Sequence, residues 1–324
     1  FIEDGVFNFD KLGNYTKILV RNLNKVINKN YYPLPETSRS NFKHRPIGIG
    51  VQGLADTFVI LRMPFDSVEA GELNKKIFEQ IYLSAVQESC EQAKKHGSYE
   101  SFNGSPASQG KLQPHLWGIS SPAWDELAEQ VKTHGLRNSL LIAPMPTAST
   151  SQIMGYNECI EPFTSNIYTR RTLAGEYIVV NKYLINDLVE LGIWNEEMKQ
   201  RIMFFKGSVQ KIPGIPDSLK KIYKTAWELK QKNILDLAAE RGPYICQSQS
   251  LNVFVENPSA KILNSIHFYG WTKGLKTGTY YIRSKPASSA QNFSMDPSLE
   301  LKLMAELSAE AEKQAETQCL SCAA

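Results

Sequence analysis

The chain has 324 residues, of which 42% are apolar and 21% are charged; these proportions are typical of a globular protein with one large domain or two smaller ones. The net charge of +3 and the scattered Lys and Arg do not indicate a nucleic-acid-binding protein, and no apolar run approaches the roughly 20 residues of a membrane span. Five cysteines do not form the pattern of a secreted disulfide framework, so we expect a reducing compartment.

The N-terminal part of the sequence predicts two amphipathic helices with a glycine-rich segment between them. Apolar residues recur at helical spacing over residues 9–27 and 70–96, which predicts the two helices. The segment between them contains Gly48, Gly50 and Gly53, the spacing of a dinucleotide-binding fingerprint, but the first glycine lies inside the predicted strand and no acidic residue follows at the expected distance. A tightly packed strand-to-helix connection is the better interpretation.

The most informative stretch is residues 138–156, which predicts a strand, a turn and a helix. An apolar run over residues 139–143 is followed by two prolines, and then by Thr147, Ala148, Ser149 and Thr150, before a helical pattern begins at Ser151. A helix start has unpaired N–H groups, and nearby hydroxyls add donors, so this place suits an anion. We predict a substrate phosphate site here; an ordinary helix cap is the alternative.

The second half of the sequence predicts helices at residues 175–191, 194–205, 219–241 and 259–270, and strands at residues 248–255 and 279–283. Helices that alternate with short strands indicate an α/β architecture with parallel strands. From Pro286 onward Ala, Ser, Glu, Lys and Gln dominate, a composition that predicts a mobile tail.

Cys319-x-x-Cys322 lies close to the end of the sequence. Two thiols at this spacing can close a disulfide and pass electrons by thiol exchange, which a mobile tail would deliver to a partner. Half of a zinc site and a chance pair are the alternatives; a zinc site normally needs four ligands, and no His or other Cys lies close in the sequence.

Tyr280 and Tyr281 lie in the predicted strand at residues 279–283. Adjacent strand residues face opposite sides of a sheet, so on local grounds we expect one tyrosine in the core and the other at its rim. A functional role requires the two phenols to lie close together. The five histidines lack metal-ligand spacing, so we predict no metal site. No local set of Ser, His and Asp can be assembled for nucleophilic catalysis either.

Together these stretches resemble one family, the class I, eukaryotic-like ribonucleoside-diphosphate reductase large subunits. The resemblance extends from Phe1 to about Pro286 and resumes at the terminal cysteine pair. It is carried by the signature Trp124-x2-Leu127-x7-Gly135-Leu136-Arg137-Asn138-x3-Ile142-Ala143-x2-Pro146 and by HRPIGIGVQGLAD (44–56), APMPTAST (143–150), EPFTSNIYTRR (161–171), AAERG (238–242), SQSLN (248–252) and HFYGWTKGLKTGTYYIR (267–283).

The resemblance implies an α/β barrel of ten strands, of which this chain is the second half. Residues 1–286 are then the C-terminal half of the barrel, and residues 287–324 are a flexible tail that ends in the CxxC redox arm. The family's finger loop with the radical cysteine, its barrel redox cysteines and its effector sites precede Phe1. We therefore expect a piece of a longer or split protein that is inactive by itself.

The resemblance also implies site residues. Thr147, Ala148, Ser149 and Thr150 match the loop that binds the substrate diphosphate. Tyr280 and Tyr281 match the stacked pair that relays a radical from the small subunit to the finger-loop cysteine. Cys319 and Cys322 match the dithiol that re-reduces the barrel disulfide and is itself reduced by thioredoxin or glutaredoxin. The helices predicted at residues 219–241 and 259–270 match the docking groove for the small subunit's C-terminal tail.

The implied activity is the reduction of ribonucleoside diphosphates to 2′-deoxyribonucleoside diphosphates by radical chemistry, in the cytoplasm. The implied partners are the small subunit with its di-iron/tyrosyl radical, the N-terminal half of the large subunit, a second large subunit, thioredoxin or glutaredoxin, and the nucleotide, with no cofactor held by this chain and no nucleic acid or membrane. Two alternatives stay open: a catalytically inert relative that binds and regulates the small subunit, and a free-standing thiol–disulfide carrier.

Overall fold

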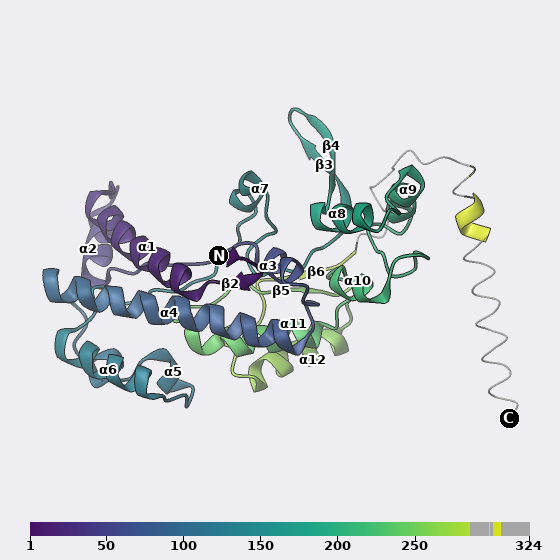
Figure 1. Ribbon diagram of the computed structural model, residues 1–324. Helices are drawn as coiled ribbons and strands as arrows, with labels where there is room; N and C mark the ends of the chain where they lie inside the picture. Colours follow the sequence, from purple (N-terminus) through teal and green to yellow (C-terminus); the bar gives the residue numbers. More distant parts are fainter. Residues whose placement is uncertain (286–297, 299–300, 306–324) are drawn as a thin grey trace, which may run out of the picture. The chain divides into compact units, whose positions relative to one another are not determined.

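The structure is a computed structural model that describes residues 1–285, 298 and 301–305 (Figure 1). The chain divides into two compact units. Unit 1 comprises residues 1–162 and 226–285, and unit 2 comprises residues 163–225 with the described residues beyond 286. Within the described ranges, no helix combines the length and the apolar character that crossing a membrane requires.

Unit 1 is mainly helical, and its two longest helices, α1 and α4, pack side by side (Figure 1). Its helices are α1 (Phe9–Lys29), α2 (Pro35–His44), α3 (Leu54–Ile60), α4 (Val68–His96), η1 (Ala107–Gln109), α5 (Gln113–Leu116), α6 (Pro122–His134), α7 (Thr150–Met154), α11 (Gln231–Arg241), η2 (Gly242–Tyr244) and α12 (Ala260–Thr272). Its strands are β1 (Ile2–Glu3), β2 (Val6–Phe7), β5 (Asn252–Phe254) and β6 (Tyr281–Arg283).

Side-chain caps fix where the long helices of unit 1 begin. Asn8 accepts a hydrogen bond from the Lys11 amide ahead of α1, and Ser67 accepts one from the Ala70 amide ahead of α4. Such caps satisfy amides that the first helical turn leaves unpaired. The predicted helices at residues 9–27 and 70–96 are thus confirmed, with small shifts at their ends.

Three short extended segments, around Ile49, Ile142 and Gln247, lie side by side in unit 1. Ile49 and Ile142 form an isolated parallel bridge, and the Gln247 amide donates to the Ile142 carbonyl at 3.2 Å. The glycines of the first segment permit this close approach, because a Cβ on Gly50 would lie 3.1 Å from the Pro144 Cα and one on Gly48 would lie 3.2 Å from the Ala143 Cβ. The packing interpretation of the glycine pattern is therefore the correct one.

Strands β5 and β6 run parallel, with Asn252 beside Tyr281 and Phe254 beside Arg283. Beneath them lies a hydrophobic cluster that includes Val253, Leu235 of α11 and Ile266 of α12. Burial of these apolar side chains holds the short parallel pair in place, since two short strands by themselves have little stability.

Unit 2 consists of a β-hairpin followed by short helices. Strands β3 (Ile167–Thr172) and β4 (Gly175–Val180) pair antiparallel, and the helices are α8 (Lys182–Glu190), α9 (Glu196–Phe204) and α10 (Asp217–Ile222) (Figure 1). Buried Asn166 donates to the carbonyls of Gly207 and Tyr223 at 2.9 Å, which fixes where the hairpin leaves the helices.

Two predicted helices are only partly correct: of the helix predicted at residues 175–191, α8 forms Lys182–Glu190. Residues 175–180 form strand β4, because a β-branched run follows the turn at Gly175 and pairs with β3. The helix predicted at residues 219–241 is two helices, α10 and α11, separated by residues 223–230.

The predicted mixture of helices and parallel strands is present in the parallel pair β5–β6 and in the Ile49–Ile142 bridge. Within the part of the chain that the structure describes, however, the strands form three two-stranded sheets, and they do not close into a barrel. The ten-stranded arrangement stays a prediction.

Candidate functional site

The loop at residues 143–150 has the predicted form. Pro144 is buried, whereas Ala148, Ser149 and Thr150 are exposed. Helix α7 begins at Thr150, inside the hydroxyl cluster as predicted, but it has only five residues and ends at Gly155 in the left-handed conformation. The dipole of so short a helix is small, so hydroxyls and loop amides must supply most of any attraction for an anion.

Thr147 anchors this loop to the segment that follows it. Its side-chain oxygen accepts from the Cys159 amide at 2.8 Å, and its carbonyl accepts from the Ser151 amide at 2.9 Å and from the Ser151 hydroxyl at 2.6 Å. Ser149, the residue ahead of α7, makes no side-chain cap. The loop is therefore held at Thr147, while the side chains of residues 149 and 150 are exposed and Ser151 is buried.

Tyr280 and Tyr281 lie side by side, with ring centroids 4.3 Å apart and ring planes 59° apart. About half of each side chain is exposed, 52% for Tyr280 and 54% for Tyr281. The local expectation that one ring is core and the other rim is wrong: Tyr280 lies ahead of the first residue of β6, so strand alternation does not govern the pair, and both rings are exposed. The pair has the proximity that a functional role requires.

The backbone under the tyrosine pair is fixed by its neighbours. The Tyr280 amide donates to the Leu251 carbonyl at 2.7 Å, and the Tyr281 amide donates to the side-chain oxygen of Asn252 at 3.2 Å. The hydrogen bond and the charge of Tyr281 raise the pKa of Tyr280, so the Tyr280 phenol stays protonated at neutral pH.

A buried carboxyl lies behind the pair. Glu161 is 9% exposed, and its Oε1 accepts from the Asn252 side-chain nitrogen at 2.6 Å. Burial raises the pKa of Glu161 to about 7, against the opposing influence of Arg283. Glu161 and Asn252 both belong to motifs of the family resemblance. The sequence predicts a role for neither, because no local pattern pairs two positions that lie 91 residues apart.

The predicted redox pair, Cys319 and Cys322, lies outside the described residues. The other three cysteines are free thiols. Burial raises the pKa of Cys159 to about 11 and also raises the pKa of Cys90 and of Cys246. Thiols of this kind exist almost wholly in the unreactive protonated form at neutral pH, as expected of packing residues.

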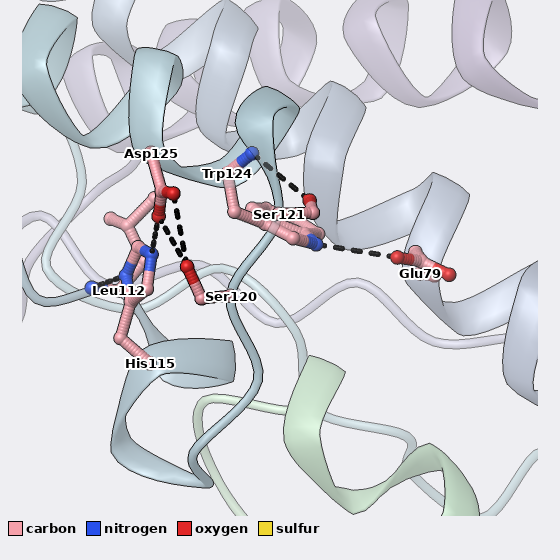
Figure 2. A network of polar contacts seen from close by, with 7 residues as sticks. All are labelled: Glu79, Leu112, His115, Ser120, Ser121, Trp124 and Asp125. Atoms are coloured by element: carbon pink, nitrogen blue, oxygen red, sulfur yellow. Dashed lines mark hydrogen bonds and ion pairs between the residues drawn. The ribbon is translucent and has the colours of Figure 1, made fainter.

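One Ser, His and Asp set does assemble, contrary to the sequence expectation, but its geometry is not that of a nucleophile (Figure 2). Asp125 accepts from the Ser120 hydroxyl at 2.8 Å and lies 3.1 Å from the His115 Nε2. The His115 Nδ1 accepts from the Leu112 amide at 3.1 Å, so Nε2 carries the proton. No ring nitrogen is then available to activate Ser120, and the cluster links α5 to the start of α6.

Known proteins match nearly the whole chain. Residues 1–281 match the family model described as "Ribonucleotide reductase, barrel domain". The chain belongs to the ribonucleotide reductase barrel-domain family. The resemblance inferred from the motifs is thereby confirmed.

Among relatives, the chain is 57% identical over 300 residues to the ribonucleoside-diphosphate reductase large chain of Schizosaccharomyces pombe, a match that covers 92% of this chain and 37% of that one. It is 52% identical over 320 residues to the ribonucleoside-diphosphate reductase large subunit of Caenorhabditis elegans, covering 98% and 41%. The chain therefore spans about two fifths or less of the length of these relatives.

A solved structure has a similar fold. The class Id ribonucleotide reductase alpha subunit of Actinobacillus ureae is 28% identical to this chain and has a TM-score of 0.67, with 85% of this chain and 46% of that one covered. The barrel-domain family and this structural likeness agree on the same class of protein.

Proposed function

We propose that this chain is a working part of a ribonucleoside-diphosphate reductase large subunit, which reduces ribonucleoside diphosphates to 2′-deoxyribonucleoside diphosphates in the cytoplasm. The observation that carries the proposal is the tyrosine pair: two half-exposed phenols with ring centroids 4.3 Å apart in a chain of the reductase family. A structural pair would be more buried, whereas a relay needs rings that touch each other and can also face a partner.

The substrate diphosphate is proposed to bind at Thr147, Ala148, Ser149 and Thr150. Support comes from the exposed hydroxyls of Ser149 and Thr150 and from the anchoring of Thr147 by the Cys159 amide. A diphosphate offers many acceptor oxygens, which hydroxyls and loop amides can satisfy together.

Tyr280 and Tyr281 are proposed to relay the radical from the di-iron/tyrosyl radical of the small subunit toward the radical cysteine of the finger loop. Within the pair, the phenoxyl radical of one tyrosine takes a hydrogen atom from the phenol of the other, so one O–H bond forms as the other breaks and each side chain must be protonated before it is oxidised. The raised pKa of Tyr280 supports this requirement.

The remaining parts of the proposal concern partners. Residues 1–286 are proposed to be half of the reductase barrel and residues 287–324 a tail in which Cys319 and Cys322 accept electrons from thioredoxin or glutaredoxin. The small subunit's C-terminal tail is proposed to dock on α11 and α12, where Gln231, Lys261 and Ile262 line a groove. A second large subunit and the N-terminal half of the barrel complete the enzyme, and the chain by itself is inactive.

The first experiment is reconstitution. The chain is combined with the N-terminal barrel half and a small subunit, and CDP reduction is measured with thioredoxin. We expect turnover by the wild-type assembly and only background turnover with Tyr280→Phe or Tyr281→Phe, because phenylalanine has no O–H hydrogen to transfer. The control variant is Tyr177→Phe, which alters a half-exposed tyrosine of β4 and should leave turnover unchanged. Full turnover by both relay variants would overturn the proposal.

A second experiment addresses the two alternative functions. Cys319→Ser should stop turnover with thioredoxin and leave most of it with dithiothreitol, because a small dithiol reaches the barrel disulfide directly. A free-standing thiol carrier would lose all activity with either reductant. An inert regulatory relative would show no turnover in any assembly.

A further inference from the structure

Glu161 and Asn252 form a buried polar pair that the proposed function leaves without a role. They are 9% and 6% exposed, and they are joined by the 2.6 Å hydrogen bond from the Asn252 amide nitrogen to the Glu161 carboxylate. A buried carboxylate is costly unless its hydrogen bonds are worth more than its lost hydration. Its charge therefore needs a role at this place.

The charge determines which way the Asn252 amide points. Asn252 must turn its oxygen toward the Tyr281 amide, which only donates, to make the 3.2 Å bond seen there. A side-chain amide can rotate by half a turn and exchange its oxygen with its nitrogen. A carboxylate only accepts, so it selects the orientation in which the Asn252 nitrogen faces Glu161 and the oxygen faces Tyr281.

We propose that Glu161 is a positioning residue for the tyrosine pair: through Asn252 it fixes the backbone of Tyr281 and with it the approach of the two phenol rings. The inference rests on the proposed function, since the pair matters only if it relays a radical. Glu161 acts through its hydrogen bond with the Asn252 amide and not on the phenol rings directly.

The same segment also holds the proposed diphosphate loop. The Asn157 side chain donates to the Glu161 carbonyl at 2.6 Å, and the Asn157 amide donates to Asp56 at 2.7 Å. Between these two positions the Cys159 amide donates to Thr147. The segment of residues 157–161 therefore contacts the loop through the Cys159 amide and contacts β5 through Glu161. A positioning residue in this segment can thus act on the tyrosine pair next to β5.

Protonation would weaken the orientation that Glu161 imposes. Burial raises the pKa of this carboxyl to about 7; Arg283 of β6 and Arg241 of α11 oppose that rise, whereas Glu158 adds to it. The remaining titratable neighbour, Cys159, is neutral at this pH. A protonated carboxyl has an O–H that can donate, so it also accepts the reversed amide. Glu161 therefore selects one orientation of the Asn252 amide above about pH 7, and this preference is lost as the pH falls below that value.

The test uses the reconstituted enzyme with the small subunit, and it compares CDP turnover of wild type, Glu161→Gln and the control Glu256→Gln between pH 6 and pH 8.5. Glutamine has the shape of glutamate but both donates and accepts, so it does not select one amide orientation. We expect Glu161→Gln to have roughly one third of wild-type turnover at pH 8, as for one weakened hydrogen bond, and to approach wild type at pH 6. Glu256, an exposed residue paired with Lys285, should give a constant ratio near one.

Asn252→Ala provides the second variant. It removes the bond to Tyr281 altogether, so adding Glu161→Gln to it should cause no further loss, a non-additivity that marks action through one residue. The Michaelis constant for CDP should stay unchanged in Glu161→Gln, which separates positioning of the tyrosines from a general loosening of the substrate loop.

Three results would count against these ideas. A Glu161→Gln to wild-type ratio that is constant with pH, in an active enzyme, overturns the positioning role alone, as does full additivity with Asn252→Ala. A wild-type assembly that makes no deoxycytidine diphosphate overturns the proposed function, and the role of Glu161 is overturned with it.

Discussion

Two polar clusters of unit 1 both contain buried side chains but differ in what surrounds them. The amide cluster consists of Asn24, Arg45, Ser89 and Asn138, and it joins α1, α4 and the segment ahead of the loop. The carboxylate cluster consists of Asn157, Glu161 and Asn252. In the first, every side-chain hydrogen bond of Asn138 is made within the cluster, whereas the second supports the exposed tyrosine pair and the hydroxyl loop.

Burial of polar groups is therefore not by itself a sign of function. Asn138 is fully buried and has every side-chain hydrogen bond satisfied inside the protein, as a structural group should. Glu161 is a carboxyl whose pKa is raised by burial to about 7, and carboxyls with strongly shifted pKa values occur more often at functional sites. Substitutions at Asn138 and at Glu161 test this contrast directly, and substitutions at Thr147 and Asp125 extend it to the loop and to an exposed cluster.

The largest effect on stability is expected from Asn138→Ala. The Asn138 side chain exchanges hydrogen bonds with Asn24 in both directions, accepts from Ser89 and donates to the Arg45 carbonyl. Removing it leaves several buried groups without partners, which should lower the free energy of unfolding by about 3 kcal/mol or more.

The measurement is urea unfolding followed by circular dichroism. Asn24→Ala should give a loss of similar size, and the two losses should not add, because each variant disrupts the same pair. The folded fraction of either variant should still support CDP turnover in the reconstituted enzyme, because the tyrosine pair is unchanged. A variant that is stable but inactive would mean that the amide cluster also serves the site.

The second prediction concerns Glu161 and pH. Because its pKa is raised from 4.5 to about 7, the folded protein binds this proton more tightly than the unfolded chain does. The contribution to the free energy of unfolding is therefore full below about pH 4.5 and is lost as pH rises through about 7. Glu161→Gln lacks this loss, so from pH 4.5 to pH 8 the variant should gain up to roughly 3 kcal/mol relative to wild type.

This gain in stability should accompany the lower turnover proposed for the same variant. Unfolding midpoints at several pH values measure it, with Glu256→Gln as the exposed control. A difference between Glu161→Gln and wild type that does not change with pH would show that the carboxyl has an ordinary pKa and would remove the contrast between the two clusters.

Several features of the site follow from sequence reasoning. The apolar run, the two prolines and the hydroxyls of residues 144–150 determine a turn and a helix start locally, and the structure has both. The family motifs indicate the tyrosine pair, although strand alternation alone places the two rings on opposite faces. The CxxC pair is also visible in the sequence, but it lies outside the described residues.

What could not be predicted depends on contacts between distant residues. The break at residues 223–230 contains no Pro or Gly, and it follows from tertiary packing, since the Tyr223 carbonyl accepts from Asn166. Hairpin β3–β4 needs the pairing of two segments that each allow another structure. The Glu161–Asn252 bond joins two motifs that no local pattern connects.

A third, smaller effect is expected at the loop. Thr147→Val keeps the shape of the side chain but removes the acceptor for the Cys159 amide. Leaving that amide unpaired should lower the free energy of unfolding by about 1–2 kcal/mol. The less tightly held loop should raise the Michaelis constant for CDP by roughly tenfold. Thr147→Ser keeps the hydroxyl and is the matched control. Equal constants for the valine variant and wild type would mean that the loop does not hold the diphosphate.

The smallest effect is expected at the His115–Asp125–Ser120 cluster. About half of the Asp125 side chain is exposed, and water competes for its contact with His115. Asp125→Ala should therefore lower the free energy of unfolding by less than about 1 kcal/mol, and it should leave CDP turnover unchanged. Urea unfolding and the turnover assay measure the two quantities, with the isosteric Asp125→Asn as control.

The outcome at Asp125 bears on how a site is recognised in this chain. Ser120, His115 and Asp125 have the residue types of a catalytic set, but Ser120 donates to Asp125 and both His115 nitrogens are engaged. If Asp125→Ala abolished turnover at unchanged stability, residue type would outweigh hydrogen-bond direction as a guide. If turnover persists, the direction of each hydrogen bond is the better criterion, and it is the same criterion by which Glu161 orients Asn252 toward Tyr281.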